Sequence, residues 1–305
     1  MSSPLNLPGL TVFERGWLSS NNVLLHDDDG ATLIDSGHAR HADQTVALLR
    51  QALQGRPLGR LVNTHLHSDH CGGNAAVQAA WSPQTQIPPG LAQAARQWDE
   101  VALGYQPTGQ MCPRFAVHGV VSPGDAISQG GHHFEALAAP GHDPHALLLF
   151  DARSGVLISG DALWQDGFGV VFPELDGEAG FDDVAATLDL IERLPVRHVV
   201  PGHGAVFDDV AGALQRARHR LAGLRRDPAR HARHGAKVLI KYHLMELGEQ
   251  QFGDLRNWLA ATPLLGSCQI RTGQAGTQLD FGLRLLDELL GSGALTRDGD
   301  TVRDA

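Results

Sequence analysis

The sequence predicts an α/β protein in which sheets and helices form separate layers. Up to residue 80, short β-branched and aliphatic runs alternate with segments of helical apolar spacing, in the order strand, helix, strand, helix. Later strand-like runs end repeatedly in clusters of glycine, proline, histidine or aspartate. The chain has 305 residues, 42% of them hydrophobic, which is enough for one large or two ordinary domains. These patterns exclude a helical bundle, and the absence of a repeat excludes a solenoid.

The first part of the chain predicts a hairpin followed by helix–strand units. The expected strands are 10–13, 22–26, 31–34 and 60–64, and the expected helices are 42–53 and 74–80. A polar turn at 27–30 joins two of the strands, and Gly55 and Pro57 stop the first helix.

The middle of the chain begins with a weaker pattern, since prolines interrupt residues 82–118. We predict a lid-like insertion there, with one short helix over 91–103. The remaining expected elements are strands at 116–121, 133–137, 146–150, 156–159 and 198–200, and helices at 181–194 and 210–224.

Composition changes after Asp227 and Pro228. Three helices, at 237–246, 252–261 and 278–290, precede two short strands about an Asp-Gly turn. We therefore predict two domains, 1–224 and 225–305, the second small, mainly helical and similar to a winged helix. A structural or dimerising role is favoured for it, so a homodimer is one expected assembly.

The formal net charge of −10 argues against a protein that coats nucleic acid. Basic residues nevertheless gather from Arg216 to Lys241, with histidines between them. A solvated helical surface is the simplest interpretation, and a site for a phosphate-bearing ligand or RNA is the alternative. A nucleic-acid partner is therefore left open but not favoured.

No stretch approaches the roughly 20 apolar residues of a membrane span, and the opening residues 1–6 lack the regions of a signal peptide. This predicts a cytoplasmic protein without a membrane partner. Three widely spaced cysteines do not suggest a disulfide framework, so metal coordination would depend on histidine and aspartate.

Residues 64–73 carry the densest chemistry of the chain. Three imidazoles and a carboxylate, at His65, His67, Asp69 and His70, directly follow the apolar run 61–62. Burying four such groups together without a metal would cost several kcal/mol, on the order expected for unpaired polar groups. Imidazole and carboxylate suit zinc and similar divalent metals, so we interpret the cluster as half of a metal site.

Four further positions place a ligand directly after a strand, in glycine-rich sequence. They are Asp35, His142, Asp161 and His203. Strand ends at one edge of a sheet lie close in space, so these side chains can converge on the first cluster. Two sets of three ligands result, His65, His67, His142 and Asp69, His70, His203, with Asp161 left to bridge them. These are the ligands that a two-metal centre requires.

These motifs resemble those of the metallo-β-lactamase superfamily. Its signature, His-x-His-x-Asp-His, stands at residues 65–70, and its later motifs match at His142, Asp161 and His203. The resemblance covers roughly residues 10 to 224 and implies an αββα sandwich with a dinuclear site at one sheet edge. It implies that the two sets named above each hold one metal, that Asp161 bridges, and that Asp35 supports a ligand.

The resemblance also implies hydrolysis by a hydroxide held between two divalent metal ions, with Asp69 orienting the water as a catalytic residue. Zinc is the expected metal, and iron or manganese are alternatives. The motif pattern is most similar to the branch of thioesterases, lactonases and glyoxalase II. The expected partner is therefore a small-molecule thioester, ester or lactone. Trp164, Phe168 and Phe172 are expected to wall an apolar pocket for it.

Three alternatives remain from the sequence. A similar fold with an appended winged-helix-like domain occurs in a group of endoribonucleases, which the basic run would suit. A mono-iron persulfide dioxygenase would use His65, His142 and Asp161 as a facial triad. The third alternative is a regulatory protein that binds metal with little turnover.

Overall fold

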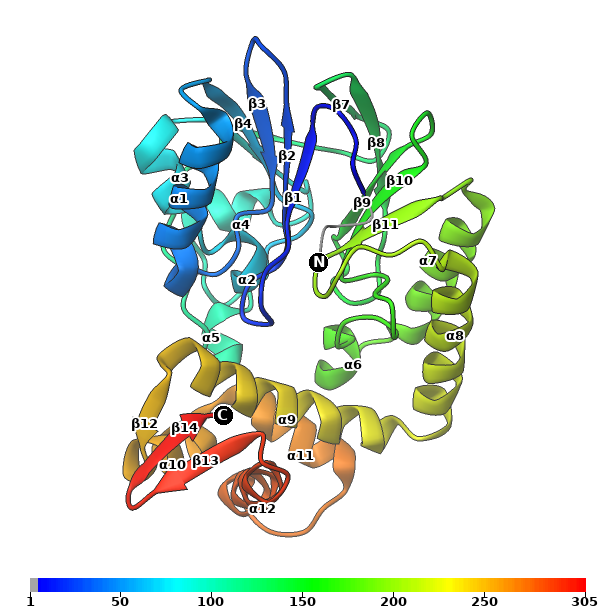
Figure 1. The fold of residues 1–305 in the computed structure, drawn as a ribbon. Coiled ribbons are helices and arrows are strands. Elements are labelled where there is room, and N and C mark those ends of the chain that lie inside the picture. The colour runs from blue at the N-terminus through cyan, green and yellow to red at the C-terminus, as the bar shows by residue number, and fades with distance from the viewer. Residues whose placement is uncertain (1–4) are drawn as a thin grey trace.

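In a computed structural model, residues 5–305 are described and form two facing sheets between outer helices, with a helical segment across one end (Figure 1). This arrangement confirms the α/β class and the αββα sandwich. Residues 1–4, part of the opening used for the localisation prediction, lie outside the described residues.

The first sheet has six strands in chain order. They are β1 (Leu10–Phe13), β2 (Asn22–His26), β3 (Ala31–Ile34), β4 (Leu58–Val62), β5 (Gln84–Ile87) and β6 (Gly119–Val120). β1 to β3 pair antiparallel, and β3 to β6 pair parallel. The carboxyl ends of β3 and β4 therefore lie at the same edge of the sheet.

The second sheet has the strand order β11-β10-β9-β8-β7. Its strands are β7 (Ala126–Gln129), β8 (His132–Ala138), β9 (Leu147–Asp151), β10 (Val156–Gly160) and β11 (His198–Pro201). β10 and β11 are parallel, and β8 runs in the same direction as β10 because each is antiparallel to β9. The carboxyl ends of β8, β10 and β11 thus share an edge.

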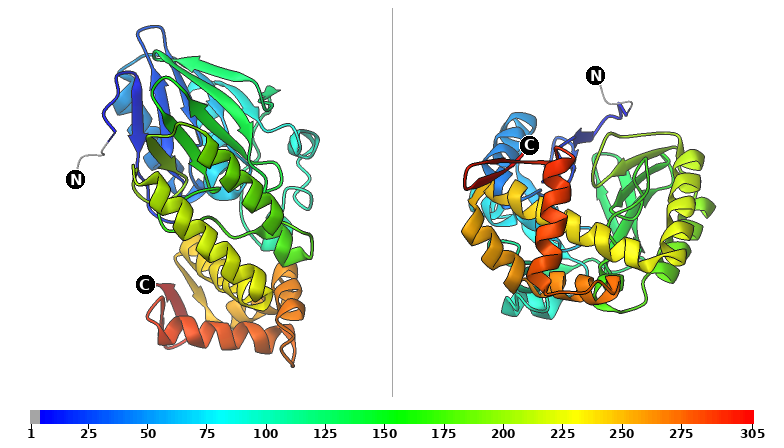
Figure 2. Two further views of the ribbon diagram at one scale, coloured as in Figure 1. Left: turned by 90° about the vertical axis from the view of Figure 1, so that its right-hand side faces the viewer. Right: turned by 90° about the horizontal axis from the view of Figure 1, so that it is seen from below.

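Helices cover the outer face of each sheet (Figures 1 and 2). On the first sheet these are α1 (Ala42–Leu53) and α3 (Asn74–Trp81), and on the second α7 (Phe181–Arg193) and α8 (Val210–Arg226). Both faces of the central strands are consequently buried, which explains their continuous apolar sequences. In β10, for example, Leu157 packs in the cluster under α7 and α8, whereas Ile158 packs in the cluster between the two sheets.

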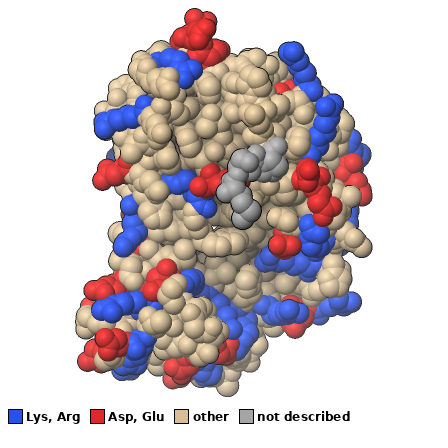
Figure 3. Space-filling view, viewed as in Figure 1, with Lys and Arg blue, Asp and Glu red and all other residues tan. Residues whose placement is uncertain are grey.

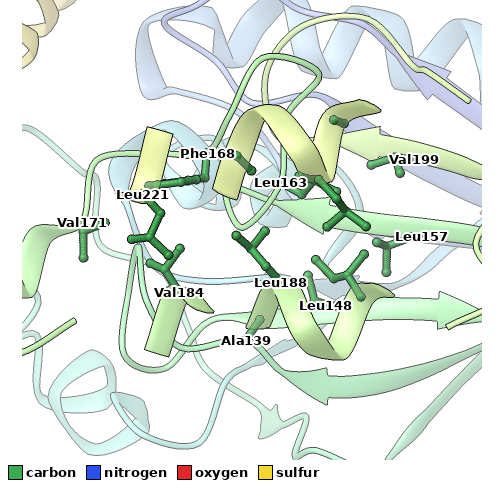
Figure 4. Packing of buried hydrophobic residues seen from close by; sticks show 14 of the residues in the cluster. Ala139, Leu148, Leu157, Leu163, Phe168, Val171, Val184, Leu188, Val199 and Leu221 are labelled. Carbon is green, nitrogen blue, oxygen red and sulfur yellow. The ribbon is translucent and has the colours of Figure 1, made fainter. Parts of the chain in front are cut away.

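Figure 4 shows the outer cluster of the second sheet at close range. Leu188 of α7 and Leu221 of α8 pack with Leu148, Leu157 and Val199 of the strands. Leu148, Leu157 and Leu188 are fully buried, and burying a leucine side chain stabilises the fold by about 1.5–3 kcal/mol. This packing fixes the second sheet, and with it the loops that leave β8, β10 and β11.

The stretch 82–118 is partly integrated into the first sheet. It contains β5, α4 (Ala92–Gln97) and α5 (Tyr105–Thr108) and leads into β6. The predicted helix over 91–103 ends early, because Trp98 adopts a left-handed conformation with φ 61° that caps α4. β5 was not predicted from the sequence, since it is short, polar and preceded by Pro83. A role of this stretch as a lid stays a prediction.

The C-terminal segment contains four helices rather than the three predicted. They are α9 (Pro228–Leu247), α10 (Phe252–Ala261), α11 (Pro263–Thr272) and α12 (Gln278–Gly291). α11 was missed because Pro263, separated from the end of α10 only by the C-cap residue Thr262, resembles a break, yet proline fits the first turn of a helix. The predicted terminal hairpin, β13 (Leu295–Asp298) and β14 (Thr301–Asp304), gains a third strand, β12 (Glu249–Gln251).

This segment has its own buried cluster, and among its buried members only Val170 and Leu175 come from before residue 225. The domain boundary at 224/225 and the similarity to a winged helix stay predictions. Within residues 5–305, no helix is long and apolar enough to cross a membrane.

Candidate metal centre

The strand ends identified in the sequence meet at the edge of the sandwich that faces α9 (Figure 1). Asp35 follows β3, and the histidine motif follows β4 and continues into the short helix α2 (Ser68–Cys71). Across the sandwich, His142 follows β8, Asp161 follows β10 and His203 follows β11. β3 and β4 run in the same direction in the first sheet, and β8, β10 and β11 run in the same direction in the second, so each set of side chains gathers at one sheet edge.

All seven residues predicted as ligands come together there, in two groups that could each hold a metal ion. Within each group the potential ligand atoms lie within 4.8 Å of one another. The groups are His65, His67, His142 and Asp69, His70, Asp161, His203. Asp161 lies between them, with one carboxylate oxygen 3.4 Å from His142 Nε2 and the other 3.4 Å from His70 Nε2. Their assignment as ligands remains a proposal.

Asp35 holds the first strand ends in position beneath the cluster. Its carboxylate accepts hydrogen bonds from Thr64 N and Thr64 Oγ1, both at 2.8 Å, and lies 2.8 Å from His70 Nδ1. A carboxylate can only accept, so Nδ1 of His70 carries a proton, and Nε2 is the nitrogen that faces the cluster. Asp35 thereby orients a ligand without being one of the seven.

We expect Asp35→Asn to weaken metal affinity by about 10- to 100-fold, because an amide cannot fix the His70 tautomer as a carboxylate does. Metal titration followed by calorimetry measures this loss. Asp43→Asn, on the exposed side of α1, is the matched control and should leave metal affinity unchanged. Equal affinities of wild type and Asp35→Asn would contradict the orienting role.

Two glycines allow the close packing of the cluster. A Cβ on Gly202 would lie 2.2 Å from an oxygen of Asp161, and a Cβ on Gly169 would lie 2.4 Å from Nδ1 of His142. Real Cβ atoms essentially never approach so closely. Gly202, the first glycine of the Pro-Gly-His-Gly motif, is therefore needed to make room for the Asp161 carboxylate. Such close contacts explain why the predicted ligands stand in glycine-rich sequence.

The donor set fits divalent metal ions. His65 Nε2 and His70 Nε2 are buried and have no hydrogen-bond partner among residues 5–305. His142 Nδ1 donates to Val170 O at 2.5 Å, so its Nε2 carries a lone pair, which lies 2.8 Å from His67 Nδ1. Buried nitrogen atoms without partners are costly unless something else coordinates them. Metal ions would satisfy these lone pairs.

The electrostatics favour the ligating protonation states of three histidines and Asp69 but not that of His70. Burial lowers the pKa of His67 and of His142 to about 4 and that of His65 well below its usual value. Burial raises the pKa of Asp69, but His70 and His203 outweigh it and bring that pKa to about 2. These imidazoles are therefore neutral, and Asp69 is ionised, at pH 7. Burial lowers the pKa of His70, but Asp161, Asp35 and Asp69 outweigh it and hold that pKa well above its usual value, so a metal ion would displace a proton there.

A cavity of about 980 Å³ opens on the cluster, and His67, Asp69, His142, Asp161 and His203 are among its lining residues. Trp164 and Phe172, two of the three aromatic residues expected to wall a pocket, line it. Phe168 does not, since it is 1% exposed and packs in the core under α7 and α8. Trp17, which was not predicted from the sequence, also lines the cavity and stacks on His203 at 5.6 Å between ring centroids.

Residues of helix α9, which lies below the sandwich in Figure 1, also line the cavity. Tyr242 Oη lies 2.7 Å from Oγ of Ser68, the residue before Asp69. One turn further along, the buried carboxylate of Glu246 lies 3.0 Å from His38 Nε2 and accepts from Met111 N at 2.9 Å. These contacts could not be predicted from the sequence, because nothing local distinguishes Tyr242 or Glu246 from other helix residues.

Comparison with known proteins supports the same interpretation. The family model described as the metallo-beta-lactamase superfamily matches residues 15–203. A hydroxyacylglutathione hydrolase of Stenotrophomonas maltophilia is 25% identical over 233 residues, which are 73% of this chain and 78% of that protein. A hydroxyacylglutathione hydrolase of Synechococcus sp. is 30% identical over 175 residues, covering 56% of this chain and 58% of that protein.

Two solved structures are similar over almost the whole chain. A metallo-beta-lactamase family protein of Thermus thermophilus has a TM-score of 0.56 and 20% identity, covering 98% of this chain and 99% of that one. A beta-lactamase domain protein of Burkholderia ambifaria has a TM-score of 0.56 and 21% identity, covering 99% and 94%. These likenesses show the fold. With a family model that matches most of the chain and a paired His/Asp cluster at the expected sheet edge, this protein belongs to the metallo-beta-lactamase superfamily and is a metal-dependent hydrolase of that fold.

Proposed function

We propose that this protein hydrolyses a small thioester, with esters and lactones as related substrates, at a dinuclear metal centre. The observation that carries the proposal is the convergence of two ligand groups on Asp161. They meet beside a cavity of about 980 Å³ that α9 also lines. The named activity of the relatives, hydrolysis of a hydroxyacylglutathione, supports a thioester as the first substrate to test.

His65, His67 and His142 would hold one metal, Asp69, His70 and His203 the other, and Asp161 would contact both. When bound, two divalent ions would polarise the substrate carbonyl and lower the pKa of a coordinated water towards neutrality.

Asp69 has the position of a hydrogen-bond acceptor that orients the attacking water. It is ionised at pH 7, lines the cavity and has one oxygen 3.1 Å from His203 Nε2. That contact restricts rotation of the carboxylate. Asp69 therefore orients the water by accepting a hydrogen bond from it at a carboxylate oxygen.

The aromatic walls of the cavity position the substrate and limit water. Trp17 and Trp164 both contact the ring of His203, with centroids 5.6 and 5.5 Å apart. Phe172 lies 4.7 Å from the ring of His67 on the other side of the cluster. An acyl group between these rings is shielded from bulk water, which strengthens the electrostatic interactions at the carbonyl.

Metal analysis with an activity assay tests the proposal. We expect about two equivalents of metal per chain, with zinc favoured, and thioester hydrolysis that a chelator removes and added metal restores. Elemental analysis and release of free thiol measure these quantities. A single iron with oxygen uptake on a persulfide substrate would instead identify a dioxygenase, and no bound metal under any loading condition would overturn the proposal.

A further inference from the structure

The basic run from Arg216 to Lys241 divides into two kinds of residue in the structure. Six of its nine Arg and Lys side chains pair with acids. The pairs are Arg216 with Asp166 and Asp209, Arg218 with Asp189 and Glu192, Arg225 with Asp182, Arg233 and Lys237 with Glu288, and Lys241 with Asp304. The other three, Arg220, Arg226 and Arg230, form no ion pair with any residue from 5 to 305.

The three unpaired arginines line a single cavity of about 420 Å³ at the junction of α8 and α9. Its remaining lining residues include His219 and His234 but no acid. Asp227, which joins the two helices, uses its carboxylate to cap α9 by accepting from Arg230 N at 3.1 Å, and it does not line the cavity. The site therefore carries uncompensated positive charge in a concave setting. Guanidinium groups match phosphate oxygens in geometry and charge.

This arginine cavity, lined by Arg220, Arg226 and Arg230, adjoins the cavity at the metal centre. Arg220 and His234 line both. The Arg220 guanidinium lies 5.1 Å from the centroid of Phe168 and 3.3 Å from His234 Nε2. Phe168 belongs to the loop that follows Asp161, so Arg220 stands where the two cavities meet. A ligand that enters the metal centre can thus extend towards the three arginines.

We propose that the arginine cavity binds phosphate groups at the far end of the substrate, so that the substrate is a thioester whose thiol portion is phosphorylated. This inference rests on the proposed thioester hydrolysis.

A small molecule is favoured over RNA, because pairing with acids neutralises the rest of the basic run. On the face shown in Figure 3, basic and acidic side chains are interspersed and form no continuous basic stripe. RNA binding relies on such an extended surface.

Kinetics with two thioesters test the proposal. Both carry the same acyl group, one on coenzyme A and the other on N-acetylcysteamine, which lacks phosphate. In the metal-loaded protein, Arg226→Gln and Arg230→Gln should each lower kcat/KM for the coenzyme A ester about tenfold, mostly through KM, as expected for loss of one charge-assisted contact. Both arginines are exposed and unpaired, so their replacement should not affect folding. The N-acetylcysteamine ester should be hydrolysed at an unchanged rate.

The matched control is the double variant Arg218→Gln/Arg225→Gln, which removes two charges from α8 outside the arginine cavity. It should leave both esters unaffected, whereas Arg226→Gln/Arg230→Gln should discriminate between them. Equal losses on both esters, or none on the coenzyme A ester, would overturn the proposal.

A binding measurement separates this proposal from the proposed activity. Calorimetry with adenosine 3′,5′-bisphosphate should show binding to wild type and to the Arg218/Arg225 control variant, and a loss of at least tenfold in affinity for Arg226→Gln/Arg230→Gln. That result would support the phosphate site even if no thioester were hydrolysed. Binding of a single-stranded RNA that depends on Arg226 and Arg230, without binding of the bisphosphate, would overturn the small-molecule assignment.

Discussion

Replacement of His65 by alanine is expected to lower kcat about a thousandfold or more and to reduce the metal content of the protein. His65 Nε2 is buried without a hydrogen-bond partner among the described residues. Its lone pair is therefore free to coordinate a metal ion. Without it, one ligand group retains only His67 and His142. A thousandfold loss corresponds to roughly 4 kcal/mol of transition-state stabilisation, a reasonable size for loss of metal-assisted catalysis. Thiol release and elemental analysis of the same samples measure both effects.

His133→Ala is the matched control for this experiment. His133 is an exposed histidine of β8 whose Nδ1 lies 2.8 Å from Ser128 Oγ, and it has no contact with the cluster among the described residues. Activity and metal content of that variant should equal those of wild type. If His65→Ala retained full activity, the chemistry would have to lie outside the two ligand groups.

The second large effect is expected for stability, at the buried pair that joins α9 to the sandwich. The Glu246 carboxylate lies 3.0 Å from His38 Nε2, and both side chains are 1% exposed. His38 Nδ1 accepts from Arg40 N, so Nε2 carries a proton and donates to Glu246. Glu246→Ala removes the acceptor and leaves His38 Nε2–H and Met111 N–H without their partner. We expect a loss of about 3–5 kcal/mol in the free energy of unfolding.

Urea unfolding followed by circular dichroism measures this loss. Glu249→Ala, three residues further on, removes an exposed pair with Arg303 and should cost less than about 1 kcal/mol. The double variant His38→Ala/Glu246→Ala should cost much less than the sum of the two single variants, because neither partner is then left buried alone. Similar small losses for Glu246→Ala and Glu249→Ala would show that α9 is not anchored by this pair.

Much of the fold follows from local pattern. Strands β2, β3 and β10 are continuous apolar runs because both of their faces are buried, and that requirement is visible in the sequence. Helix α1 was predicted with the bounds that it has, since its apolar spacing and its stop at residues 54–57 are local features. β5 and α11 were missed, because β5 depends on pairing with β4 and β6 and α11 begins at a proline that resembles a break.

Some residues of the candidate site could likewise be predicted from local sequence, and others could not. The histidine motif, Asp161 and His203 could be proposed from sequence because each combines a ligand, a strand end and glycines. Tyr242 and Glu246 could not, since their partners Ser68 and His38 lie 174 and 208 residues away in the chain. Contacts at such separation leave no periodic or local signal.

By itself the sequence determined the α/β class, the superfamily and the set of residues that gather at the sheet edge. These depend on apolar periodicity, on ligand chemistry and on turns that only glycine allows. All three can be recognised from residues that are close together in the sequence. Only the tertiary structure decided that α9 lines the cavity, that Trp17 stacks on His203, and that three arginines of the basic run stay unpaired among the described residues. The physical reason is that an arginine's charge is neutralised or free according to which acids the fold places beside it. The sequence lists the charges, and the packing of α8 and α9 selects those that remain for a ligand.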